Sequence, residues 1–487
     1  MSEGPLTELV AIGAQNVDLV TTDINKSIFQ DPIKQITNFS KASFNIYNKG
    51  KADWGSTITF NIDRKGDLLS TVYLVLKLPS ISVADISNIN PLKKDPLTSD
   101  LRVAWSNILG YAAVEKASIS IGGQLIDEQS GEFMQLITDI HDDYNRFYML
   151  GHDGIMNKPS TSIEDQVIYI PLKFWFTQNI NKALPLIALQ NHKIEIKIKI
   201  RNFNEVTNVF QVVKDENGST TLIHSNKKLN KKSIQTSHLD CTYIYLSPEE
   251  RKALAEKEHK ILITQCQERK YNIKNNTVEL DFNHLVKELF FFIQPKQNLD
   301  EGEIFNFSGK LRYPPSKFNQ DKYETGSNNT NYKTDEPIQK DIIEISSGLK
   351  KINLSTDLWE EIPSRHYLKR ARILLNGQER IQWKDHKYFY YVQPWENFKN
   401  PSTSHYYIYS FSANSRSLGN YGGCNFSRID NAQLQLEFNK PIIKKVSRKS
   451  DSTVTIGDMS DGILSVYAHN FNYLIIKGGM AGLQFNN

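Results

Sequence analysis

The segment 169–201 constrains the fold of this chain more than any other. Isoleucine occupies every second position from Ile194 to Ile200, while Glu195, Lys197 and Lys199 fill the positions between. A period of two, with β-branched residues on one face and charges on the other, is typical of a half-buried antiparallel strand. This segment therefore predicts a sheet with one face on a core and one face in water.

Shorter alternating stretches recur along the whole chain. They include 56–62, 74–79, 114–121 and 239–246, and polar or glycine-containing turns separate them. One amphipathic helix is predicted over 131–143, where apolar residues recur at helical spacing. Because few strands alternate with long helices, a parallel α/β sheet is disfavoured, and β sandwiches or jelly rolls are favoured.

The second half of the chain repeats the first in outline. Gly122 and Gly123 form a two-residue hairpin signal because both glycines accept positive φ. The segment 371–381 echoes 117–126, and Gly377 follows Gly123 by 377 − 123 = 254 positions. The alternating segment 432–438 likewise echoes 194–200. Two tandem copies of one β domain explain this order better than two unrelated domains.

The length of 487 residues is too great for one ordinary core and also indicates two large domains. A linker helix is predicted where Ser247 precedes Pro248 and Glu250, the order of a capping box with proline at the first helical position. Long polar loops are expected over 202–237 and 314–340. The predicted organisation is an N-terminal arm at 1–25, a first domain at 26–247, the linker helix at 248–260 and a second domain at 261–487.

Charge and hydropathy exclude several classes of protein. The 58 lysines and arginines against 54 aspartates and glutamates give 58 − 54 = +4. Such a near balance does not predict a nucleic-acid binder, whose basic residues would dominate one face. The N-terminus lacks the basic and apolar regions of a signal peptide, and no run reaches the roughly 18 apolar residues of a membrane helix. We therefore expect a soluble protein made in the cytosol.

The three cysteines, Cys241, Cys266 and Cys424, are widely spaced and form no C-x-x-C motif. Neither a disulfide framework nor a zinc site is expected. We interpret the three cysteines as buried free thiols of a protein in a reducing compartment. Cys424 stands after two glycines, but nothing in the sequence nominates the base that a thiol nucleophile needs. Cys424 is therefore expected to be a buried structural residue.

No familiar catalytic motif occurs in the sequence, and its 11 histidines never form H-x-H. Asp139, His141 and nearby acidic residues, with His152 and Asp153, could hold a metal, although a charged helix end explains them better. Asp385 and His386 stand at the equivalent place of the second half. The basic run at 227–232 could contact phosphate, but a solvated loop is the favoured interpretation.

A series of short motifs gives the chain a resemblance to a known family. Together they resemble, in the same order, the major capsid proteins of the nucleocytoplasmic large DNA viruses, of iridovirus, phycodnavirus and giant-virus type. The resemblance covers essentially the whole chain. The motifs are LVAIGAQ at 9–15, TNFS at 37–40, IGGQLID at 121–127, PLKFWF at 171–176, ALPLIAL at 183–189, LNGQER at 375–380, YFYYVQP at 388–394, CNFSRIDNA at 424–432 and GGMAGLQFNN at 478–487.

The resemblance implies an all-β double jelly roll: two tandem eight-stranded antiparallel jelly rolls with short helices and long surface loops. It implies a homotrimer that forms a pseudo-hexagonal capsomer and tiles an icosahedral shell, usually over an internal membrane. The implied partners are neighbouring capsomers, minor capsid and penton proteins and that membrane, with no direct nucleic-acid contact. The implied location is the virion, with synthesis and assembly in the host cytoplasm.

The same resemblance implies no catalytic residue, no cofactor and no metal, so the chain is expected not to be an enzyme. The apolar arm from Leu9 to Leu19 is expected under the shell, against a neighbouring chain, a membrane or a minor capsid protein. A carbohydrate- or receptor-binding jelly roll is the alternative, for which Trp395 or Tyr406 and Tyr407 would be exposed aromatic residues. A cupin-like enzyme is a third possibility.

Overall fold

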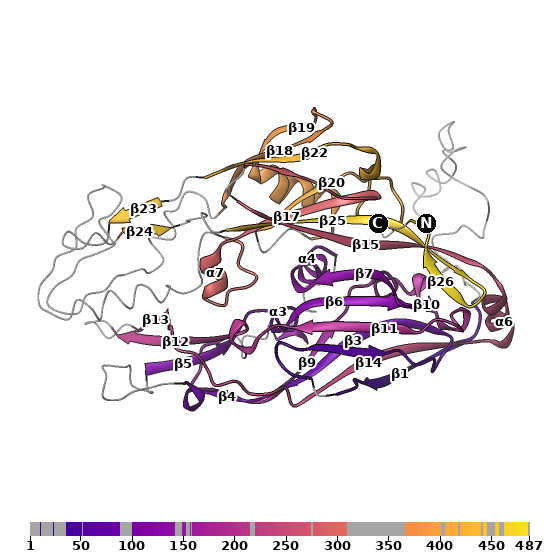
Figure 1. The fold of residues 1–487 in the computed structure, drawn as a ribbon, viewed down its shortest axis with the longest axis horizontal. Helices are drawn as coiled ribbons and strands as arrows, with labels where there is room; N and C mark the ends of the chain where they lie inside the picture. The colour runs from indigo at the N-terminus through magenta and orange to yellow at the C-terminus, as the bar shows by residue number, and fades with distance from the viewer. Residues whose placement is uncertain are drawn as a thin grey trace, which may run out of the picture.

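The structure is a computed structural model of the whole chain. Besides Val10, Asp23, Asp100 and Met156, it describes the following ranges: 36–50, 52–87, 101–141, 149–151, 158–214, 220–273, 276–308, 366–400, 405–416, 419–439, 442–445, 453–456 and 462–485. Within these ranges the chain forms two antiparallel β sandwiches that lie one above the other in Figure 1, in purple and in orange to yellow.

The first sandwich has two sheets, which we name after their strands β3 and β11. The β3 sheet has the order β1 (Phe39–Tyr47), β14 (Thr236–Leu246), β3 (Leu68–Leu78), with β9 (Gln166–Pro171) and the short β10 (Leu184–Pro185) both paired to β3. The β11 sheet has the order β2 (Thr57–Asn61), β11 (Ile194–Ile200), β6 (Val114–Ile121), β7 (Gln124–Ser130).

The alternating segment forms β11, and the prediction of a half-buried strand is confirmed. All four isoleucines from Ile194 to Ile200 are at most 2% exposed, whereas Lys197 and Lys199 are exposed. Antiparallel partners lie on both sides, since Ile196 pairs with Phe60 of β2 and with Ile119 of β6. The strand is central in its sheet, so one face is buried in the core and the other keeps its charges in water.

The second sandwich repeats the strand order of the first, with β26 as an additional strand. The β17 sheet has the order β15 (His259–Asn272), β25 (Ile463–Lys477), β17 (Leu285–Gln294), β20 (Tyr407–Ser410), with β21 (Cys424–Asn425) on β17 and β26 (Met480–Leu483) on β25. The β22 sheet has the order β16 (Thr277–Glu279), β22 (Ala432–Phe438), β18 (Leu368–Leu375), β19 (Gln378–Asp385). The predicted internal duplication is therefore present, with β11 matched by β22.

The predicted hairpins join equivalent strands in the two halves. Gly122 and Gly123 have φ of 59° and 84° between β6 and β7, and Asn376 and Gly377 have φ of 49° and 76° between β18 and β19. Positive φ at both turn residues is the requirement of a type I′ hairpin, which asparagine and glycine meet at low cost. The same turn chemistry thus fixes the same hairpin twice.

The expectation of a long loop over 202–237 is wrong in part. Strands β12 (Thr207–Lys214) and β13 (Thr220–His224) pair with each other, and β12 also pairs with β5 (Leu101–Trp105). Val209 and Phe210 are both buried although they are consecutive, so this segment lacks the simple alternation that reveals a strand. Two short strands, β4 (Ile81–Ser82) and β8 (Ser162–Ile163), pair nearby. The predicted loop at 314–340 lies outside the described residues.

Short helices and one further hairpin complete the described fold. The linker helix is α6, and its proline at the first turn is as predicted, but Ser247 makes no side-chain capping hydrogen bond, so the predicted capping box is wrong. Asp67 instead pairs with Arg251 of α6 at 3.0 Å. The helices and turns are η2 (Val83–Asp85), α3 (Leu109–Ala113), α4 (Gly131–His141), α5 (Trp175–Gln178), η5 (Ile180–Lys182), η6 (Leu186–Ala188), η7 (Phe203–Glu205), α6 (Pro248–Glu256), α7 (Lys296–Asp300), the π-helical η9 (Tyr388–Val392), α10 (Gln393–Asn397) and η10 (Phe426–Arg428); the hairpin is β23 (Ile442–Lys445) with β24 (Thr453–Ile456).

The hydrophobic core of the first sandwich extends into the contact with the second. Its buried cluster includes Phe290, Phe292 and Tyr467 from β17 and β25, while a second cluster fills the interior of the second sandwich alone. Alternate residues of β17 therefore serve two cores, because successive side chains of a strand point to opposite faces. Among the described helices, none is long and apolar enough to cross a membrane.

Candidate assembly surfaces

Residues that the sequence suggested for chemistry are used in packing. Asp139 is buried at the end of α4 and accepts a hydrogen bond from the hydroxyl group of Tyr406. The ring of His141 lies 5.6 Å from that of Phe398. Among the described residues, no group of three or more histidine, cysteine or acidic side chains has an arrangement that could hold a metal ion. Residues 142, 143, 152 and 153 lie outside the described ranges.

The cysteines are free thiols, but only Cys241 is fully buried. Burial raises the pKa of Cys241 to about 12, and burial also raises the pKa of Cys424 above its ordinary value. Cys424 keeps part of its surface exposed on β21, so the expectation that it is buried is wrong. β21 pairs only with β17, so solvent reaches its other edge. The sequence alone did not indicate this position at the edge of the sheet. A raised pKa keeps the thiol protonated and does not favour a nucleophile.

The basic run at 227–232 is tied to the first sandwich. Lys231 pairs with Asp53 at 3.0 Å, and Lys232 pairs with Asp85 at 2.7 Å. Leu229, two residues before Lys231 in the run, is only 4% exposed. Lys228, Asn230 and Lys231 are exposed, so the run is a solvated surface loop as favoured, and the ion pairs of Lys231 and Lys232 hold it against the first sandwich.

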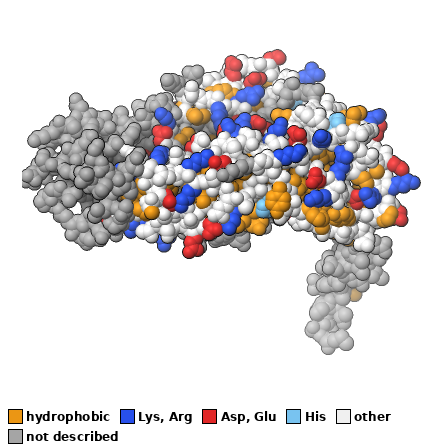
Figure 2. Space-filling model, turned by 60° about the horizontal axis from the view of Figure 1, so that its bottom comes forward, with side chains coloured by type: hydrophobic (Ala, Val, Ile, Leu, Met, Phe, Trp, Pro, Cys, Tyr) orange, Lys and Arg blue, Asp and Glu red, His pale blue; other side chains and the backbone are white. Residues whose placement is uncertain are grey.

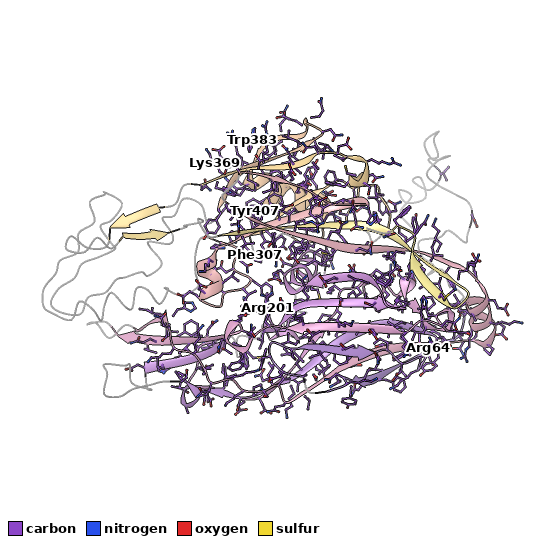
Figure 3. The ribbon with its side chains drawn as sticks, in the orientation of Figure 1. Arg64, Arg201, Phe307, Lys369, Trp383 and Tyr407 are labelled. Atoms are coloured by element: carbon purple, nitrogen blue, oxygen red, sulfur yellow. The ribbon has the colours of Figure 1, made fainter. Side chains whose placement is uncertain are left out.

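The aromatic residues proposed for sugar binding divide into two groups. Tyr406 and Tyr407 are 0% and 1% exposed, and Figure 3 places Tyr407 among the strands of the second sandwich. The expectation that they are exposed is wrong, because β20 pairs with β17 and buries them. Trp395 is 78% exposed on α10, as the alternative requires.

Three histidines from separate segments meet at one end of the second sandwich. The ring of His366 lies 4.4 Å from that of His386 and 4.6 Å from that of His405, and its Nδ1 lies 3.1 Å from the hydroxyl oxygen of Tyr407. Burial and the neighbouring histidines lower the pKa of His366 to about 3. Its imidazole is therefore neutral at physiological pH. Only His386 was singled out from sequence, since roughly twenty residues separate each member from the next.

The contact between the two sandwiches centres on α4, which covers the outer face of β17 and β25. The ring of Phe133 lies 6.2 Å from that of Phe290 and 5.7 Å from that of Tyr467. Every residue from Gly131 to Ile140 is buried, so both faces of α4 are covered. Sequence predicted this helix but assigned it only one apolar face. Its second covered face depends on a sandwich more than a hundred residues away in the sequence.

Hydrogen bonds join polar groups across this contact. The backbone N–H of Cys266 in β15 donates to Asp127 of β7 at 2.9 Å, and the side chain of Gln265 donates to the carbonyl oxygen of Ile126. The hydroxyl groups of Tyr467 and Ser130 lie 3.0 Å apart. Buried polar groups that keep their partners fix one relative placement of the two sandwiches.

Two buried ion pairs support the elements that form the contact. Arg201, at the end of β11, pairs with Glu132 in the first turn of α4, and both side chains are largely buried. In the second sandwich the Nζ of Lys287 lies 2.8 Å from Glu288, whose other oxygen lies 3.2 Å from His469. Burial opposes the charge of Glu288, but Lys287 and His469 lower its pKa below the ordinary range. Removing one partner would leave an uncompensated buried charge.

Two other surfaces expose apolar side chains. On η9 and α10, Tyr391 and Trp395 are 54% and 78% exposed beside a groove of about 870 Å³. On the outer face of the β3 sheet, Val167 and Tyr169 are 49% and 43% exposed. Large exposed aromatic residues on neighbouring positions mark interaction surfaces.

Two matching antiparallel sandwiches, joined through a buried helix, define a double jelly-roll protein whose conspicuous features are contact surfaces. The family model described as "Large eukaryotic DNA virus major capsid protein" matches residues 250–482, and the one described as "Major capsid protein N-terminus" matches residues 27–247. The chain belongs to the family of major capsid proteins of large eukaryotic DNA viruses. The resemblance inferred from the motifs is thereby confirmed.

Relatives of known role extend over the whole chain. The major capsid protein of Phaeocystis pouchetii virus is 29% identical and aligns with 99% of this chain and 100% of its own. That of Paramecium bursaria Chlorella virus 1 is 25% identical with the same coverage. These relatives are structural proteins, so the role of this chain is to form a virus capsid, and it is not an enzyme.

Solved structures show the same fold. The quasi-atomic model of the PBCV-1 virus capsid has a TM-score of 0.66 at 23% identity and covers 95% of this chain and 100% of its own. The Faustovirus major capsid protein has a TM-score of 0.62 at 12% identity, with 98% and 99% covered. The double jelly roll is confirmed. The residues at which its parts begin, and the lack of catalytic, cofactor or metal residues, stay predictions.

Proposed function

We propose that three copies of this chain form a pseudo-hexagonal capsomer, and that these capsomers tile an icosahedral shell. The observation that carries the proposal is the duplication within the chain, in which β2, β11, β6 and β7 are matched in order by β16, β22, β18 and β19. Three chains with two similar sandwiches each present six similar units around an axis. Because the six units are similar, each can make a similar contact with the neighbouring capsomer that it faces.

The mass of the purified full-length protein tests the trimer. Light scattering on a size-exclusion column is expected to give three times 55.9 kDa, or about 168 kDa, and negative-stain images are expected to show hexagonal outlines. A folded monomer at every soluble concentration would contradict the trimer. The family assignment does not depend on this result.

The proposed capsomer has further partners. We propose contacts with neighbouring capsomers, minor capsid and penton proteins and an internal viral membrane, with synthesis and assembly in the host cytoplasm. The near-neutral net charge of +4 supports close packing of like chains, because mutual repulsion is weak. Nucleic acid is not among the proposed partners.

We propose that the apolar arm from Leu9 to Leu19 lies under the shell against one of these partners. The arm lies outside the described residues except for Val10, which is 80% exposed. Deletion of residues 1–25 is expected to leave the trimer intact and to abolish or strongly reduce particle assembly, measured by sedimentation of particles from infected or co-expressing cells. Unchanged particle yield would contradict this role.

A further inference from the structure

The helices that follow the two equivalent hairpins differ in how they are covered. Helix α4 follows the β6–β7 hairpin, and η9 with α10 follows the β18–β19 hairpin. Every residue of α4 from Gly131 to Ile140 is buried, whereas Tyr391, Val392 and Trp395 are 54%, 38% and 78% exposed. We name these last three residues the aromatic face. Helix α4 is therefore covered on all sides, whereas the equivalent η9 and α10 leave the aromatic face exposed to solvent.

The partner of α4 is the outer face of the β17 sheet. Phe290 of β17 and Tyr467 of β25 contact Phe133 of α4 from that face. Phe398, just after α10, joins the same contact, since its ring lies 6.1 Å from that of Phe290. The chain thus contains one complete example of a hairpin-following helix docked on the outer face of a sheet from the other sandwich.

The equivalent outer face in the first sandwich belongs to the β3 sheet. On it Val75 of β3 pairs with Tyr169 of β9, and Tyr73 lies two residues before Val75 on the same face. Val167 and Tyr169 are 49% and 43% exposed. We name Tyr73, Val167 and Tyr169 the receiving face; Val75 between them is only 3% exposed. Figure 2, in which the lower side of Figure 1 comes forward, shows patches of orange hydrophobic side chains on this side of the molecule.

We propose that the aromatic face of one chain docks on the receiving face of a second copy of this chain. Within one chain, the α4 contact has used the helix of the first sandwich and the sheet of the second. The helices η9 and α10 of the second sandwich and the β3 sheet of the first make no such contact with each other within the chain. A helix–sheet contact of the same kind can therefore form between two chains. Because the two faces differ, the contact is heterologous and repeats around a ring.

The chemistry of the two faces fits this occupant. The groove beside the aromatic face is lined by the apolar Pro394 and Phe398 and by the basic Lys399 and Arg416. Arg416 also donates a hydrogen bond to the carbonyl oxygen of Trp395 at 2.6 Å. Asp240 of β14 pairs across the strands with Tyr73 of the β3 sheet, and its carboxylate accepts a hydrogen bond from Ser43. Phe398 already belongs to the contact with α4, so docking here would extend that contact continuously from one chain to the next. Tryptophan, tyrosine and arginine, all present on or beside the aromatic face, are enriched among interface hot spots.

Truncation variants of the full-length chain test the docking. This inference rests on the proposed trimer, so the wild-type mass is measured first. We expect Trp395→Ala and Tyr169→Lys each to raise the protein concentration at which half of the trimers dissociate by at least about tenfold. Phe485→Ala is the matched control, because Phe485 is an aromatic residue that is 48% exposed outside both faces. This control is expected to keep the wild-type mass.

A cross-linking experiment tests which faces meet. Cys266 and Cys424, which are not fully buried, are first replaced by serine. In this background Val167→Cys and Val392→Cys are introduced singly or together, and the protein is oxidised. If the two faces meet, oxidation of the double variant should give a covalent species of three chains. Oxidation of either single variant should give no cross-link between chains. Cross-linking by either single variant would overturn the heterologous contact.

The remaining outcomes separate this inference from the trimer itself. A wild-type monomer would contradict the proposed trimer. A wild-type trimer that Trp395→Ala and Tyr169→Lys leave intact would overturn the docking alone. If Trp395→Ala leaves the trimer intact but abolishes binding on a glycan array, the docking is likewise overturned. The groove is then assigned to a carbohydrate.

Discussion

At the scale of single residues, Asp127 couples the contact between the sandwiches to pH. Burial raises the pKa of its carboxyl group to about 7, although Cys266 and Gln129 donate hydrogen bonds to it. This pKa lies above the ordinary value of 3.8, so the folded chain binds the proton more tightly than the unfolded chain does. The stability that Asp127 contributes is complete below pH 3.8 and is lost as the pH rises through 7.

We expect Asp127→Asn to remove this dependence. Relative to the variant, the wild-type free energy of unfolding should fall by roughly 2–4 kcal/mol between about pH 4 and about pH 8. The asparagine loses one acceptor for Gln129, but that cost does not change with pH. Denaturant midpoints of both proteins across this range measure the difference. A constant difference would show that Asp127 ionises in the folded chain as it does in the unfolded one.

At the scale of elements, the start of α4 is fixed by close backbone packing. A β-carbon at Gly131 would lie 2.2 Å from the carbonyl oxygen of Tyr111 and 2.3 Å from that of Val114. Both atoms belong to the backbone of α3 and β6, which cannot yield as a flexible side chain can. The close approach of these elements therefore requires glycine, for a reason that involves no unusual φ.

Gly131→Ala is expected to lower the free energy of unfolding by about 3 kcal/mol, because α4 must move away from α3 and β6. Gly123→Ala is the matched control. Gly123 has a φ of 84° but nothing within 4 Å of its added β-carbon, so only about 1 kcal/mol of backbone strain is expected. Thermal denaturation compares the two. Equal losses would mean that α4 packs more loosely than the distances indicate.

At the scale of the whole molecule, the two sandwiches share one continuous apolar cluster. Phe290 and Phe292 of β17 belong to it together with residues of the first sandwich. The ring of Phe292 also stacks on that of Phe307 at 4.0 Å, and Figure 3 shows Phe307 near α7 between the two sandwiches. A shared core of this kind predicts that the two sandwiches unfold in one cooperative transition.

Phe290→Ala is expected to destabilise both sandwiches by about 3–5 kcal/mol, because it leaves a cavity in the core that they share. Hydrogen exchange of the amides in β11 and β22 reports on each sandwich separately, and both sets should exchange faster. Phe485→Ala, at an exposed position, should change neither set. Faster exchange in β22 alone would show that the sandwiches unfold independently.

The sequence by itself determined the strand β11, the two hairpins and the duplication, because these depend on alternation and turn residues within about ten positions. It did not reveal β12 and β13, where consecutive buried residues hide the alternation. It could not show that α4 is covered on both faces, that Asp127 is buried or that Tyr406 is hidden while Trp395 is exposed. Those properties were decided by the tertiary structure, since each depends on which distant strand packs against the residue, and the contact between the sandwiches brings such strands together.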